Sequence, residues 1–259
     1  MAELSAKPDR KRHTACDCTR RNLCEILEHT RAVLLDFDGP ICAVFGGYPS
    51  TNTADRLRQE LKSLGVPIPG LFPTRDPLAV LGMDGIPDSV RRNLESLVQA
   101  GEMRAAEFAV PTTGTDEFLS ACQRRGLPVV IVTNNSPGAV QRYLDRLNIQ
   151  ELVKAVFARD PGDPSRMKPD PYLVDQAVGY LGLPAGACVL IGDSSTDVAA
   201  AHAAGVRSIG YANKPGKRDR LQAAGADAVV CTMGELAAAV AGAVRHRSGS
   251  WDYPAPSLR

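Results

Sequence analysis

The chain has 259 residues, of which 44% are hydrophobic and 23% are charged, proportions that are ordinary for a folded protein. Its formal net charge of +1 gives no reason to expect binding to nucleic acid or to an anionic membrane. No apolar run approaches the roughly 20 residues that span a bilayer, and the first residues contain no hydrophobic segment of the signal-peptide kind. We therefore expect a cytoplasmic protein without membrane or nucleic-acid partners.

Residues 1–20 are polar and basic, which predicts a disordered arm, and residues 247–259 predict a flexible tail. Four residues near the N-terminus offer an alternative, a zinc site: His13, Cys16, Cys18 and Cys24. Their spacing matches no usual zinc pattern, so we favour the arm. Four further cysteines lie in apolar neighbourhoods, where a thiol behaves as a small hydrophobic group. These are Cys42, Cys122, Cys188 and Cys231, and they favour a reducing compartment.

The first predicted strand covers residues 32–35, a continuous apolar run of the kind buried on both faces of a parallel sheet. Two acids, Asp36 and Asp38, follow it directly. Like charges repel and burial is costly for them, so a pair of carboxylates at a strand end calls for a chemical reason.

A long segment over residues 45–110 contains no convincing buried strand. Its apolar spacing predicts helices over 54–64, 89–99 and 102–108, joined by pieces rich in glycine and proline. We interpret it as an α-helical cap domain inserted after the first strand. Ligands of α/β proteins bind outside the carboxyl ends of the strands, so an insert at this point is expected to cover the site.

Strands and helices alternate in the rest of the chain. Apolar runs predict strands over 127–132, 187–191, 206–211 and 228–231. Helices are predicted from Pro137, with Ser136 as the N-cap, over 173–181 ending at Gly182, and over 196–204 ending at Gly205. This order predicts an α/β fold with a doubly wound parallel sheet, formed by a core domain of residues 21–44 and 111–246.

Polar residues follow each central strand. Thr133 and Asn134 come after the second run, and Asp193 and Asp197 after the third, with Lys168 in the loop that precedes it. All strands of a parallel sheet end at the same edge, so these groups are expected to converge with Asp36 and Asp38. Two carboxylates about 4 Å apart repel by about 4 kcal/mol at an effective dielectric of 20, so Asp36, Asp193 and Asp197 need a cation.

Ligands that are all oxygens suit Mg²⁺, which commonly grips a substrate phosphate as well. Thr133, Asn134 and Lys168 are the candidate phosphate-binding residues. In this interpretation Asp36, fixed at the strand end, attacks phosphorus and forms an aspartyl-phosphate. Asp38, two residues further on, protonates the leaving group and later deprotonates the attacking water.

The set Asp36-Phe37-Asp38-Gly39, Thr133, Lys168 and Asp193 with Asp197 resembles the four motifs of the haloacid dehalogenase superfamily. The resemblance covers roughly residues 32–240 and implies a Rossmann-like core with a small helical cap, as in phosphoglycolate-phosphatase-like members. It implies the same nucleophile and acid/base. It also implies a Mg²⁺ site of Asp36, the backbone carbonyl of Asp38, Asp193 and Asp197. The family more often has Thr or Val at the position of Pro40, which we expect to stiffen the loop leading to the cap.

The predicted function is Mg²⁺-dependent hydrolysis of a small phosphorylated metabolite, a phosphate monoester. A phosphosugar mutase and a non-catalytic binding module remain alternatives, and the oligomeric state is left open between monomer and homodimer. Six arginines of the cap have two possible interpretations, contact with a second anionic group of the substrate or a place on the surface. They are Arg56, Arg58, Arg75, Arg91, Arg92 and Arg104. A basic run is interpreted as a solvated face: Lys214, Lys217, Arg218 and Arg220.

Overall fold

The computed structural model describes residues 22–68, 76–83 and 85–242. The expectations for the N-terminal arm, the C-terminal tail, His13, Cys16, Cys18 and Arg75 lie outside these residues. Within the described ranges, no helix combines the length and the apolar character needed to cross a bilayer.

One six-stranded sheet forms the core, with the strand order β5–β4–β1–β6–β7–β8 and every neighbouring pair parallel. The strands are β1 (Ala32–Leu35), β4 (Val129–Val132), β5 (Ala155–Phe157), β6 (Cys188–Gly192), β7 (Arg207–Tyr211) and β8 (Ala228–Val230). The central strand β1 pairs with β4 and β6, so that Leu35 lies beside Ile131 and Ile191. The predicted doubly wound α/β fold is confirmed.

Helices cover both faces of the sheet because each buried strand presents apolar side chains in both directions. Val33 and Leu35 face one layer, and Ala32 and Leu34 face the other. The first layer holds residues 22–29, α4 (Thr115–Arg124), α5 (Pro137–Leu147) and α9 (Met233–Gly242). The second holds α6 (Tyr172–Leu181) and α7 (Ser195–Ala203), while α8 (Lys217–Ala223) packs on β7 and β8. Short 3-10 turns are η2 (Gln150–Leu152), η3 (Pro164–Arg166) and η4 (Ala185–Ala187).

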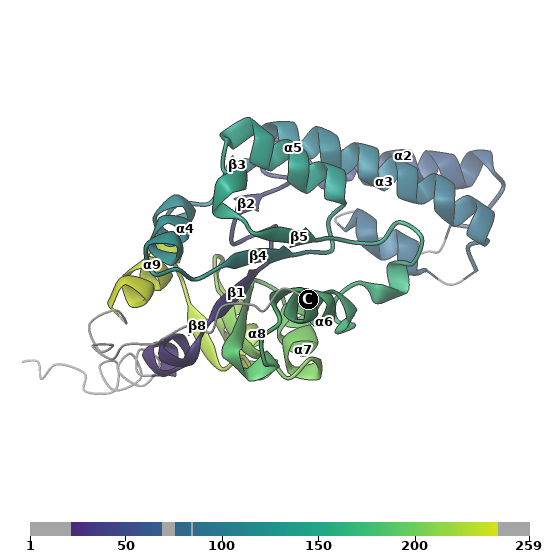
Figure 1. The fold of residues 1–259 in the computed structure, drawn as a ribbon. Helices are drawn as coiled ribbons and strands as arrows, with labels where there is room; N and C mark the ends of the chain where they lie inside the picture. The colour runs from purple at the N-terminus through teal and green to yellow at the C-terminus, as the bar shows by residue number, and fades with distance from the viewer. Residues whose placement is uncertain (1–21, 69–75, 84, 243–259) are drawn as a thin grey trace, which may run out of the picture.

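The insert after β1 is helical, as predicted, and has a small apolar core of its own. It consists of α2 (Ser50–Ser63), η1 (Pro77–Gly82) and α3 (Asp88–Phe108), and α3 packs along α5 of the core (Figure 1). The prediction of two separate helices over 89–99 and 102–108 is wrong, because α3 is continuous through Gly101. A Cβ at Gly101 would collide with the Thr53 side chain, so glycine permits the close approach of α2 and α3.

Two short strands that were not predicted join the insert to the core. β2 (Cys42–Ala43) and β3 (Val110–Pro111) pair antiparallel at the point where the chain leaves and re-enters the core. The edge strand β5 was not predicted either.

The cysteine interpretation holds for three residues and fails for one. Cys42, Cys122 and Cys188 are buried free thiols, whereas Cys231 is exposed. Cys231 lies just beyond the end of β8, where its sulfur accepts a hydrogen bond from Arg218 at 3.0 Å.

Candidate active site

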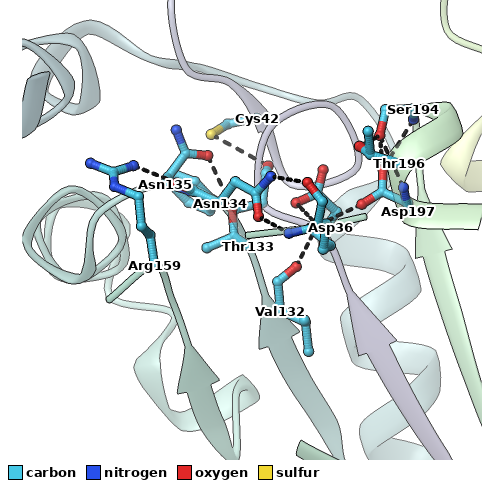
Figure 2. Close-up of polar contacts among 12 residues, drawn as sticks. Asp36, Cys42, Val132, Thr133, Asn134, Asn135, Arg159, Ser194, Thr196 and Asp197 are labelled. Atoms are coloured by element: carbon cyan, nitrogen blue, oxygen red, sulfur yellow. Dashed lines mark hydrogen bonds and ion pairs between the residues drawn. The ribbon is translucent and has the colours of Figure 1, made fainter. Parts of the chain in front are cut away.

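The predicted site residues meet at the carboxyl edge of the sheet, where Figure 2 shows Asp36, Thr133, Asn134 and Asp197. Asp36 and Asp38 follow β1, Thr133 and Asn134 follow β4, and Asp193 follows β6. All seven line one cleft of about 260 Å³: Asp36, Asp38, Thr133, Asn134, Lys168, Asp193 and Asp197. The topology thus brings together groups that come from opposite halves of the chain.

Lys168 is the buried cation of this cleft. Its Nζ lies 2.8 Å from Asp36 Oδ1 and 2.5 Å from Asp197 Oδ1, and it donates to the carbonyl of Val132 at 2.8 Å. Its side chain is 2% exposed, so the two ion pairs are largely shielded from water. The carboxylates raise the pKa of Lys168 although burial opposes this, so the ammonium stays charged at neutral pH.

Asn134 places Lys168 in the cleft. The backbone N–H of Lys168 donates to Asn134 Oδ1 at 2.8 Å, and Asn134 Nδ2 donates to the carbonyl of Lys168 at 2.9 Å. Both ends of this side-chain amide are therefore used to fix the lysine loop.

Three carboxylates form a compact cluster beside the lysine. Asp36, Asp193 and Asp197 each offer an oxygen, and these oxygens lie within 4.8 Å of one another. At 4.8 Å a pair of carboxylates repels by about 3.5 kcal/mol at an effective dielectric of 20. Burial, followed by the charge of Asp197, raises the pKa of Asp36, and burial raises the pKa of Asp193. Closely spaced oxygens with excess negative charge fit a hard divalent cation.

Asp197 has a second, structural task at the start of α7. Its Oδ2 accepts hydrogen bonds from Ser194 N at 3.0 Å and Ser194 Oγ at 2.6 Å, while Asp197 N donates to Ser194 Oγ at 3.2 Å. This capping box fixes the carboxyl group, so that Oδ1 faces Lys168.

Asp193 has a partner that the sequence interpretation missed. Lys217 Nζ contacts Asp193 Oδ2, so the interpretation of Lys217 as part of a solvated face is wrong. The loop after β7 carries Lys217 back over the site, a long-range contact that local charge patterning does not reveal. Gly39 also lies against Asp193, since a Cβ there would be 2.5 Å from Asp193 Cγ.

Asp38 lies at the mouth of the cleft. Its residue is exposed, but the surrounding protein still desolvates the carboxyl group, which raises its pKa to about 6. The N–H of Val44 donates to Asp38 Oδ1 at 2.9 Å and opposes part of this shift. A carboxyl group with a pKa of about 6 can carry a proton close to neutral pH and release it, as an acid/base residue must.

The cap supplies the wall opposite the acids. Apolar side chains from this side are Phe45, Pro77, Leu78 and Val98. Two acids, Asp76 and Glu102, also line it. Asp76 accepts hydrogen bonds from the amides of η1, and Glu102 reaches the loop after β4. Among the described residues that line the cleft, Lys168 is the only cation.

Comparison with known proteins agrees with this geometry. Residues 30–205 match the haloacid dehalogenase-like hydrolase family. A phosphoglycolate phosphatase of Cupriavidus necator is 29% identical over 228 residues, covering 80% of this chain and 91% of that protein. A phosphoglycolate phosphatase of Pseudomonas savastanoi is 32% identical over 196 residues, covering 69% of this chain and 68% of that protein.

Solved structures share the fold. A predicted phosphatase from Clostridium acetobutylicum superposes with a TM-score of 0.66 at 16% identity, covering 81% of this chain and 97% of the other. The sequence match, the site geometry and the shared fold lead to one conclusion. The chain belongs to the haloacid dehalogenase-like hydrolase family and, like the relatives it resembles, is a phosphatase.

Proposed function

We propose that the protein is a Mg²⁺-dependent phosphatase that hydrolyses a small phosphate monoester through an aspartyl-phosphate on Asp36. The observation that carries the proposal is the meeting of Asp36, Lys168, Asp193 and Asp197 at one sheet edge, with Asp38 at its mouth. Asp36, Asp193, Asp197 and the backbone carbonyl of Asp38 would hold Mg²⁺, which would supply positive charge to offset the repulsion between the carboxylates and the phosphoryl group.

The residues of the chain divide the chemistry between them. Lys168 and the hydroxyl of Thr133 hold the phosphoryl oxygens. A carboxylate oxygen of Asp36 attacks phosphorus while the bond to the leaving oxygen breaks, and Asp38 gives that oxygen its proton. Asp38, now ionised, takes a proton from the water that attacks the aspartyl-phosphate. Free phosphate leaves, Asp36 is restored, and Asp38 carries its proton again.

The cleft favours a small substrate, since its volume of about 260 Å³ lies below the range of roughly 300–1,000 Å³ usual for ligand pockets. Phosphoglycolate is the first candidate, because the names of both sequence relatives point to it. The described cap wall favours a different leaving group, one that is uncharged, because it is apolar and acidic. The relative kcat/KM for phosphoglycolate and for glycerol phosphate separates these two cases.

The test is release of inorganic phosphate from p-nitrophenyl phosphate and from a panel that includes phosphoglycolate, glycerol phosphate, sugar phosphates and nucleotides. We expect turnover with Mg²⁺, loss in EDTA, and loss in Asp36→Asn. The matched control is Asp175→Asn, which changes an exposed acid on α6. A higher kcat/KM for phosphoglycolate than for glycerol phosphate supports phosphoglycolate as the substrate, and the reverse order supports an uncharged leaving group.

Two results would contradict the proposal. Absence of turnover across the panel, with Mg²⁺ bound, favours the non-catalytic module. Conversion between sugar phosphates without release of free phosphate favours the mutase, which shares the same core residues and differs in what the cap holds.

A further inference from the structure

Arg159, directly beyond β5, lies at the centre of a buried ion network that the mechanism above does not use. Its side chain has no exposed surface, and all five of its N–H groups donate. Nε and Nη2 donate to Glu95 Oε1 at 3.1 and 2.8 Å. Nη1 and Nη2 donate to the two oxygens of Glu102, both at 3.1 Å, and Nη1 also donates to the carbonyl of Asn134.

Glu102 extends this network from the cap to the loop that holds Thr133. Glu102 Oε1 accepts from Asn135 Nδ2 at 3.2 Å, and Glu102 Oε2 accepts from the backbone N–H of Ser136 at 3.0 Å. Glu95 and Glu102 both lie on the cap helix α3, whereas Arg159 and the loop of residues 133–136 belong to the core. A single carboxylate therefore joins a cap helix to three separate groups of the core.

Asn135 passes the constraint on to the phosphate-binding hydroxyl. The backbone N–H of Asn135 donates to Thr133 Oγ1 at 3.1 Å, and Thr133 Oγ1 donates to Asn135 Oδ1 at 3.0 Å (Figure 2). Asn135 thus fixes Thr133 with one end of its side chain while Glu102 holds the other end. Arg159 also holds this loop directly. Its Nη1 donates to the carbonyl of Asn134, and its backbone N–H donates to the carbonyl of Asn135 at 3.2 Å.

We propose that Arg159 and Glu102 are positioning residues that set the geometry of the phosphate-binding loop, residues 133–136, and make it depend on the docked cap helix α3. This inference rests on the proposed phosphatase function, and it assigns to the cap a task beyond covering the cleft. Neither residue reacts with substrate. Both act through Asn135 on Thr133.

The network is more specific than cap–core packing requires. Two carboxylates share one guanidinium, and Glu95 Oε2 is buried without a hydrogen-bond partner. Helix α3 is also joined to the core at the surface, where Glu107 of α3 pairs with Arg142 of α5. That exposed pair does not reach the loop, so Glu107→Gln is the matched control for a cap–core ion pair without a positioning role.

The decisive variant is Arg159→Lys, which keeps the charge but loses the planar fork of donors. Five quantities are compared with wild type and with Glu107→Gln. They are the dissociation constant of inorganic phosphate, the KM and the kcat for p-nitrophenyl phosphate, the half-saturating Mg²⁺ concentration, and amide hydrogen exchange of residues 133–136 in the ligand-free protein. Since a small misplacement of a binding group is costly, we expect the phosphate constant and KM to rise by about ten- to hundredfold. Exchange of the loop should accelerate, and the Mg²⁺ requirement should stay within about twofold.

A double variant tests the route. Adding Asn135→Ala to Arg159→Lys should raise the phosphate constant little further, because both changes release the same hydroxyl. Additive effects of the two changes would overturn the proposal. It would also be overturned if Arg159→Lys were less stable than wild type but matched Glu107→Gln in phosphate binding and in loop exchange. If Arg159→Lys does not fold, the same quantities are measured on Glu95→Gln. This variant keeps an acceptor for Arg159. If wild type proves inactive, the proposed function fails, while exchange of the loop still decides this proposal.

Discussion

Replacing Lys168 by methionine is the most direct test of how the acid cluster is held. The side chains of Lys168, Asp36 and Asp197 are 2%, 11% and 3% exposed, so both ion pairs are shielded. Methionine has a similar length and no charge, so it leaves two carboxylates without their cation. Removing one partner of a buried pair costs about 3–5 kcal/mol of unfolding free energy. A cost of that size is a large part of a typical total of roughly 5–15 kcal/mol.

This cost has a signature in metal and pH. In EDTA we expect the melting temperature of Lys168→Met to fall by about 6–20 °C, at about 2–4 °C per kcal/mol. Magnesium should restore more stability to the variant than to wild type, because it neutralises the uncovered acids. Burial raises the pKa of Asp36 from 3.8 to about 8, so the folded protein binds this proton more tightly than the unfolded chain. Stability from this group therefore rises as the pH falls from about 8 towards 3.8. Lys168 lowers this pKa, so its removal raises the pKa further, and the deficit of the variant should be smallest at low pH, where Asp36 is protonated in both proteins.

The assay is urea unfolding followed by circular dichroism, with and without Mg²⁺, at neutral pH and at pH 5. The control is Lys154→Met, which changes an exposed lysine just before β5. Unfolding free energies of Lys168→Met and Lys154→Met that differ by less than about 0.5 kcal/mol in EDTA would contradict a structural role for the two ion pairs. The same holds if Mg²⁺ stabilises the Lys168 variant no more than wild type.

Three further predictions concern neighbouring groups. Asp38→Ala should lower kcat on an alkyl phosphate by about 10²–10⁴ and lower it less on p-nitrophenyl phosphate, whose leaving group departs without a proton. Wild-type kcat/KM for the alkyl substrate should fall as the pH rises above the Asp38 pKa of about 6. Equal losses on both substrates would argue against an acid role. Gly39→Ala, at φ 111°, should displace Asp193 and raise the half-saturating Mg²⁺ concentration about tenfold in a calorimetric titration, whereas Gly65→Ala, also at positive φ but with open space around it, should not. Lys217→Gln should lower the Mg²⁺ concentration needed, because Lys217 competes with the metal for the Asp193 carboxylate, and unchanged metal binding would contradict this.

The central strands and the groups at their ends could be predicted because their signals are local. β1, β4 and β6 are buried over their whole length, so each appears as an uninterrupted apolar run. β5 is only three residues long and partly exposed, and β2 and β3 have two residues each, which is too short for any periodicity. The gap between the predicted helices 89–99 and 102–108 contains Gly101, whose packing against Thr53 is a tertiary contact that the local sequence does not reveal.

The site divides in the same way. Residues at strand ends were predicted to converge because parallel topology alone places them together. Lys217 and Arg159 could not be predicted, because their partners lie far away in the sequence. Glu95 and Glu102 are two helical turns apart on α3, a spacing that predicts a common face but does not say that the face is buried.

The paired strands β2 and β3 hold the two ends of the cap side by side, so the cap can be exchanged as a unit. Ala43 lies opposite Val110, so residues 44–109 begin and end at neighbouring positions about 5 Å apart. Exchanging this segment for another of different length changes no strand of the sheet and adds little to the entropy cost of closing the chain. Such an exchange preserves the core only in part, because a foreign cap must also supply a carboxylate where Glu102 meets the phosphate-binding loop. A requirement for the carboxylate of Glu102 therefore limits cap exchange in this chain more strongly than the fold does.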